Sequence, residues 1–149
     1  GTSGLSGTSG TSGSSGTSGT SSITSTLTGQ YASNDGESTT TSTTYRTKLT
    51  MSYSCTATGT YILWWTCEGT NSQTNKLTQI KVDIDDTDVV DESYAPSWTS
   101  NVYGPIGSFK ELSLTSGTTY SIKIKWRVDP TSSGTAKIKN ARLLIVRRT

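Results

Sequence analysis

The chain has 149 residues, a net charge of +2 from 13 basic and 11 acidic side chains, and only 30% hydrophobic residues. This balance offers no strong electric field to nucleic acid or to a membrane surface, so neither is expected as a partner. The absence of histidine excludes the usual catalytic triads and most transition-metal sites. We therefore expect no enzyme activity, no cofactor and no bound metal.

The start of the chain carries a glycine at every third position, at Gly1, Gly4, Gly7, Gly10, Gly13, Gly16 and Gly19. A flexible linker needs glycine but no strict period, whereas three polyproline II chains can share one axis only where every third residue lacks a side chain. Residues 1–21 are therefore predicted to form a collagen-like triple-helical stalk, and residues 22–149 its head domain. A flexible or mucin-like linker is the alternative, because the repeat contains no proline.

The remaining residues alternate between apolar and polar side chains, as half-buried strands do. The clearest strand is predicted at Tyr120–Val128, whose even-numbered residues are apolar. Further strands are predicted at Ile23–Tyr31, Tyr45–Ala57, Tyr61–Gly69, Ile80–Ile84, Phe109–Leu114 and Leu143–Val146. About eight strands with antiparallel turn spacing predict an all-β fold, an antiparallel β-sandwich of the jelly-roll type.

Cys55 and Cys67 are the two cysteines of the chain. If the strands on either side of Thr58 and Gly59 form a hairpin, the residue opposite Cys55 is near Ile62, so the spacing does not imply a cross-strand disulfide. We expect two reduced thiols in the core, with a disulfide as the alternative.

Two segments, Tyr61–Trp65 and Leu143–Val146, are apolar at every position. A strand that is apolar on both faces needs cover on both faces, either from loops of its own subunit or from a neighbouring subunit. The three chains expected of the stalk favour a neighbouring subunit. We therefore predict a homotrimer interface at Ile62, Trp64, Leu144 and Val146.

Two further stretches contain candidate binding groups. The acidic run Val82–Glu92 could offer oxygen ligands to calcium, but it lacks the glycine and glutamate spacing of an EF-hand loop, so a solvated acidic loop is favoured, with Asp83 facing solvent. The segment Tyr94–Pro105 combines flat aromatic rings with short polar groups, which suits contacts to carbohydrate or protein. Its possible ligand contacts are Tyr94, Trp98 and Tyr103; the alternative is that Trp98 caps one end of the sandwich.

The proline-free Gly-Thr-Ser triplets before a β-sandwich resemble the collagen-like fibre and decoration proteins of bacteriophages, with trimeric tumour necrosis factor-like jelly-roll heads. The segment Thr115–Arg148 is similar to the last two strands of such heads, with a Tyr-x-Ile-x-Ile-x-Trp strand, a glycine-containing turn and an Ile-x-Asn-Ala-Arg-Leu strand. This resemblance supplies no catalytic residues. It implies a homotrimer at the virion surface, in contact with other virion structural proteins.

We therefore expect a structural fibre, or a decoration protein of the capsid or tail, that aids attachment to the host. One alternative is a secreted bacterial surface or spore filament protein with sugar on the threonines of its stalk. Another is a receptor-recognition head that binds a host-surface glycan.

Overall fold

A computed structural model describes residues 29–95 and 98–148, and the predicted stalk lies outside these residues. They form nine strands: β1 (Gly29–Asn34), β2 (Ser38–Thr40), β3 (Arg46–Ser54), β4 (Gly59–Asn71), β5 (Thr78–Ile84), β6 (Asp88–Ala95), β7 (Gly104–Leu114), β8 (Thr119–Val128) and β9 (Ala136–Arg147). Within the described part of the chain, no helix is long and apolar enough to cross a membrane.

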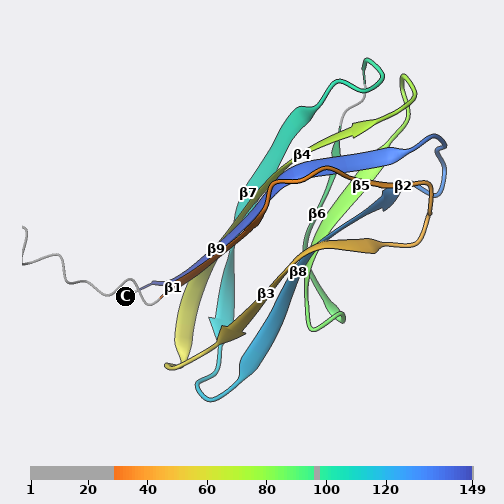
Figure 1. Cartoon of the computed structure of the whole chain (residues 1–149). Coiled ribbons are helices and arrows are strands. Elements are labelled where there is room, and N and C mark those ends of the chain that lie inside the picture. Colours follow the sequence, from red (N-terminus) through yellow and green to blue (C-terminus); the bar gives the residue numbers. More distant parts are fainter. Residues whose placement is uncertain (1–28, 96–97, 149) are drawn as a thin grey trace, which may run out of the picture.

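The strands form two antiparallel sheets packed face to face (Figure 1). The first sheet has the order β1-β9-β4-β7, with the short β2 also paired to β9, and the second has the order β3-β8-β5-β6. From β3 onward the chain changes sheet at every connection except the β5–β6 hairpin, which is jelly-roll connectivity. The predicted all-β, antiparallel, two-sheet sandwich is confirmed.

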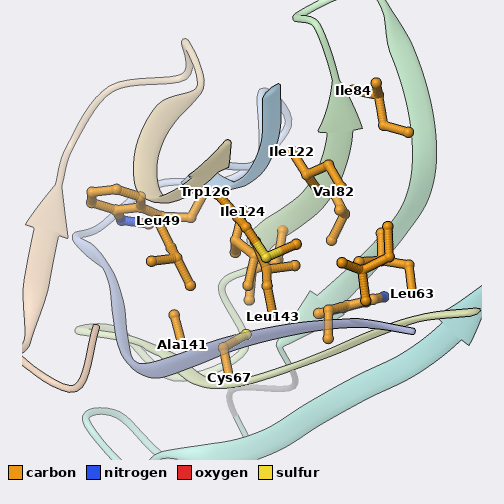
Figure 2. Close-up of a cluster of buried hydrophobic side chains, with 14 of the residues drawn as sticks. Leu49, Leu63, Cys67, Val82, Ile84, Ile122, Ile124, Trp126, Ala141 and Leu143 are labelled. Carbon is orange, nitrogen blue, oxygen red and sulfur yellow. The ribbon is translucent and has the colours of Figure 1, made fainter. Parts of the chain in front are cut away.

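Inward-facing side chains of the two sheets form one hydrophobic core. Ile122 and Ile124 of β8 face the core together with Leu143 of β9, and the Trp126 ring lies beside Leu49 of β3, as the alternation in each strand predicts (Figure 2). Cys55 and Cys67 are both buried free thiols, which confirms the prediction of reduced cysteines. Burial raises the pKa of the Cys67 thiol to about 12, so this sulfur is an apolar core group at neutral pH.

The strands on either side of Thr58 and Gly59 do not form a hairpin with each other. The strand before this turn, β3, pairs with β8 in the second sheet, whereas the strand after it, β4, pairs with β7 and β9 in the first. The turn therefore crosses between the sheets. Local alternation predicts strands but cannot distinguish a hairpin from a crossing of this kind.

A bulge in β3 also changes the predicted pattern of that strand. The register shifts between Thr47 and Leu49, so Lys48 points inward beside Leu49, and Tyr45 lies on the outer face of the second sheet rather than in the core. There Lys81 and Arg127 stack on the Tyr45 ring, 4.5 and 4.2 Å from its centroid.

Lys48 anchors the turn between β1 and β2. Its ammonium group donates to the Asn34 Oδ1 at 3.0 Å, to the Ser38 Oγ at 3.1 Å and to the Gly36 carbonyl. The side chain is only 5% exposed, and these three acceptors offset the cost of burying its charge. Lys48 thus fixes β1 at the edge of the first sheet.

Asp83 does not face solvent as predicted. It is fully buried on the outer face of the second sheet, where the ammonium groups of Lys81 and Lys125 lie 3.2 and 2.9 Å from its carboxylate. Asp91, from the same acidic run, accepts a hydrogen bond of 3.0 Å from the Trp65 indole. The run is therefore a hairpin whose tip, residues 85–88, is exposed to solvent as predicted. Asp83 is the exception, and Asp91 links the two sheets through Trp65.

Asp86, at the tip of that hairpin, gives a pH prediction. Hydrogen bonds from Lys123 and Lys125 hold the pKa of its carboxyl at about 2, below the ordinary 3.8. The Asp86 carboxylate binds a proton more weakly in the folded state than in the unfolded state. Its ion pairs therefore stabilise the fold above about pH 4, and this stabilisation is lost as the pH falls from 3.8 to 2.

We therefore expect Asp86→Asn to have a lower thermal midpoint than the wild type at pH 7. The difference between the two midpoints should become smaller as the pH falls towards 2. Thermal melts between pH 7 and pH 2 test this. A gap that stayed constant across that range would contradict the ion pairs.

Candidate functional site

The outer face of the first sheet carries a continuous row of large apolar side chains. Tyr31 of β1 lies opposite Leu144 of β9, Leu144 lies opposite Trp64 of β4, and Trp64 lies opposite Phe109 of β7. These four residues, hereafter the apolar row, are 56%, 38%, 49% and 55% exposed in this order. The row thus crosses strands β1, β9, β4 and β7 of the sheet and is covered by no segment among the described residues.

Direct contacts make the row a continuous surface. The rings of Trp64 and Phe109 are 5.0 Å apart between centroids and tilted by 33°. Beside the row, Ile62 of β4 pairs with Val146 of β9 on the same face. The second pair extends the apolar surface towards the end of the sandwich where β1 begins.

Polar residues border the row on both sides. Arg142 of β9 forms an ion pair with Asp35 on one side, and Glu111 of β7 forms one with Arg148 on the other. Hydrogen bonding to Asp35 raises the pKa of Arg142, which keeps this border charged. An apolar centre with a polar rim is the usual composition of a protein–protein interface.

Two hollows flank Trp64, so its indole forms a ridge between them. The larger, of about 650 Å³, lies between Trp64, Phe109 and the polar groups of Glu68, Asn140 and Arg142. The smaller, of about 190 Å³, lies on the side of Tyr31 and Leu144. A ridge between two hollows gives this face a shape into which a complementary surface can pack closely.

Gly107 of β7 keeps the larger hollow open. A β-carbon at this position would lie 2.7 Å from the Trp65 carbonyl oxygen and 2.8 Å from the Thr66 Cγ2, so no side chain fits without a shift of the β4 backbone. Glycine at position 107 therefore allows β7 to approach β4 closely at the floor of this hollow.

The structure brings the four predicted interface residues together on one face. Trp64 and Leu144 are directly opposite, and so are Ile62 and Val146. Each of the two apolar segments alternates, with Leu63 and Leu143 buried and their neighbours Trp64 and Leu144 exposed. Within residues 29–95 and 98–148, no loop of the same subunit covers Trp64 or Leu144.

The sequence reasoning missed Tyr31 and Phe109, the two ends of the row. Phe109 begins the predicted strand Phe109–Leu114, in which an odd-numbered residue faces away from the even-numbered Leu112 and Leu114. That parity was the available signal. Tyr31 had none, because its partner strand could not be known from the sequence.

The three predicted ligand contacts have different surroundings. Tyr94 lies in β6, where its hydroxyl accepts a hydrogen bond of 3.2 Å from the Gln79 side chain. The Tyr103 hydroxyl donates to Glu37, and the Lys139 ammonium lies 4.2 Å from its ring centroid. Burial and Glu37 raise the pKa of Tyr103. Trp98 is 82% exposed, so it does not cap the end of the sandwich.

Neither a protein-family model nor a curated protein sequence matches the chain. Among solved structures, it is similar to the C-terminal domain of EclA, a sugar-binding protein, with 12% identity over 73% of this chain and 77% of that one and a TM-score of 0.46. It is also similar to the tumour necrosis factor Eiger from S. frugiperda, with 12% identity, coverage of 63% and 62%, and a TM-score of 0.44.

A third similar structure is the C-terminal CBM6 of LamC, a marine laminarinase from Zobellia galactanivorans, with 12% identity, coverage of 79% and 100%, and a TM-score of 0.42. At these identities the likeness concerns the β-sandwich fold alone.

Proposed function

We propose that the protein is the head and stalk of a homotrimeric surface fibre, with a role in assembly and attachment rather than catalysis. The head trimerises through the apolar row of the β1-β9-β4-β7 sheet, and the Gly-X-Y repeat forms a three-chain stalk. The observation that carries this proposal is the exposure of Tyr31, Leu144, Trp64 and Phe109 in one uninterrupted row.

Self-association follows from the extent of this exposure. Single exposed apolar residues are common on protein surfaces, but a contiguous patch with a polar rim marks an interaction site. The head is also lean in apolar residues, so burial between subunits would add hydrophobic stabilisation that its own core lacks. Identical heads held on one stalk are each other's nearest partners at high local concentration.

The number three comes from the repeat. Glycine at every third position is needed where three chains share an axis, and the repeat leads into β1 at Gly29, which pairs with Val146 beside the apolar row. The proline-free triplets lack preset backbone angles, so they depend on the heads to hold the three chains together. Stalk and head therefore support each other's assembly.

A glycine at the axis of a triple helix distinguishes this stalk from a flexible linker. Gly10→Val should unwind the stalk locally and expose it to protease, whereas Thr11→Val, which points outward, should change little. Limited proteolysis of both variants and the wild type, below the melting temperature of the head, tests this. Rapid and equal cleavage of all three within residues 1–21 would show a flexible linker instead.

The virion surface is the proposed location, and other virion structural proteins are the proposed anchor. The alternative is a secreted bacterial surface or spore filament protein whose stalk threonines carry sugar. Intact mass of material from the native source separates the two: hexose increments within residues 1–21 favour the filament, and an unmodified mass favours the virion fibre.

A further inference from the structure

Three loops gather at the end of the sandwich that lies opposite the start of β1. Gly29 pairs with Val146, near the last residue of β9, whereas the first residue of β9, Ala136, pairs with Asn71, the last residue of β4. The β4–β5, β6–β7 and β8–β9 connections all lie at this second end, far from the point where β1 enters the head (Figure 1). On a fibre they would face outward.

Asn71, which is fully buried, ties the three loops to one another. Its backbone carbonyl accepts a hydrogen bond from the Asn101 amide at 2.9 Å, and its side-chain amide donates to the Ser133 carbonyl at 3.1 Å. Its Oδ1 accepts a hydrogen bond of 3.0 Å from the backbone amide of Gln73. The Asn71 side chain and backbone carbonyl thus hold one residue of each loop in place before any partner arrives.

Further bonds join the β4–β5 and β8–β9 loops. The Leu77 amide donates to the Ser132 Oγ at 2.8 Å, and the Asp129 amide donates to the Leu77 carbonyl at 3.1 Å. Gly134 has a φ of +88°, and a β-carbon there would lie 2.2 Å from the Asn71 Oδ1. The contact with Asn71 therefore requires glycine at this position.

The surface that these loops present is uncharged. Among their described residues, 72–77, 98–103 and 129–135, every exposed side chain is neutral: Gln73, Thr74, Asn75, Leu77, Trp98, Thr99, Asn101, Val102, Pro130, Thr131 and Ser133. The charged members of these segments, Lys76 and Asp129, are half-buried and buried. Charged groups from outside these segments contact Tyr103: Glu37 accepts a hydrogen bond from its hydroxyl, and the Lys139 ammonium lies against its ring.

We infer that this end of the head binds a neutral saccharide. The Trp98 indole, 82% exposed, offers a flat apolar face on which a sugar ring can stack. In the same loop, the exposed hydroxyl of Thr99 and amide of Asn101 can donate to and accept from sugar hydroxyls. The order imposed by Asn71 lowers the entropic cost of binding. This inference rests on the proposed function in one respect: the loops face away from the fibre only if the head is carried on a stalk.

A glycan array that carries neutral hexose and N-acetylhexosamine oligosaccharides beside sialylated and sulfated ones tests the inference, with the full-length protein as the probe. We expect binding confined to neutral glycans and a loss of about tenfold or more for Trp98→Ala, as for the removal of a central aromatic anchor. Val89→Ala is the matched control, because Val89 is 55% exposed but lies in β6 beside the hairpin at the opposite end. It should bind like the wild type.

Sedimentation and a thermal melt of each variant accompany the array. Trp98→Ala should keep the wild-type assembly and thermal midpoint, because its side chain is exposed. Binding to anionic glycans only, binding to no glycan, or equal binding by Trp98→Ala would each overturn the saccharide site. A monomer that binds neutral glycans through Trp98 would keep the site and refute the trimer, so the two proposals fail separately.

Discussion

Leu144→Asp should convert the trimer into folded monomers. Leu144 lies in the middle of the apolar row, between Tyr31 and Trp64, so the new carboxylate would be buried against a neighbouring subunit without a partner. Burying an unpaired charge in a dry contact costs several kcal/mol of binding free energy. The contribution of a single side chain to the interface is too small to offset this cost. Sedimentation velocity measures the change in mass directly.

The monomers of this variant should keep their fold, because Leu144 is already 38% exposed within one subunit and its removal opens no cavity in the core. Thr50→Asp is the matched control. Thr50 is exposed on β3 in the second sheet and pairs with Lys123, so the same new charge lies outside the proposed interface. If Leu144→Asp stayed trimeric, or if both variants dissociated, the apolar row would not be the interface.

Asp83→Asn should destabilise the head by about 3 kcal/mol, the lower end of the cost of breaking a buried ion pair. The carboxylate lies between the ammonium groups of Lys81 and Lys125, and its removal leaves Lys81 without the anion it faces at 3.2 Å. Lys125 keeps its ion pair with Asp86, which limits the loss. Urea unfolding at pH 7 measures the free energy of unfolding.

Asp86→Asn is the control for this prediction. Asp86 contacts the same Lys125 from the tip of the hairpin, but its side chain is 56% exposed, so water replaces most of what the carboxylate supplies. We expect a much smaller loss than for Asp83→Asn. If both variants lost the same free energy of unfolding, burial would not determine how much each ion pair stabilises the fold.

The strands and the core of this fold could be predicted from the sequence because both depend on local alternation. Ile80, Val82 and Ile84 of β5 and Ile122, Ile124 and Trp126 of β8 are buried as their parity requires. What alternation lacks is the partner of each strand. The crossing at Thr58 and Gly59 and the pairing of β1 with β9 arise from contacts between residues distant in the sequence.

The positions of Tyr45 and Asp83 differ from those predicted by alternation for local structural reasons. The bulge at Lys48 shifts the face of every residue before it, so Tyr45 leaves the core, and no residue type in that segment marks the bulge. Asp83 looked solvent-exposed because an acidic residue between apolar ones usually lies on a wet face. It is buried beside the long side chains of Lys81 and Lys125, whose ammonium groups both contact its Oδ2.

The candidate site was half predictable. Trp64 and Leu144 stood out because they lie in segments without polar residues, and strand register brings them directly opposite each other. The loops at the far end could not be assembled from the sequence. Their order depends on Asn71, one of five asparagines in the chain, whose hydrogen bonds reach residues about 30 and 60 positions away.

Trimerisation of the head is the central claim, and sedimentation equilibrium of a fragment of residues 22–149 tests it without the stalk. The apolar row predicts that this fragment sediments as three chains at micromolar concentration, since its four exposed side chains remain available for burial. A fragment that sedimented as one chain across that range would contradict the account, because the row would then be insufficient to hold the heads together.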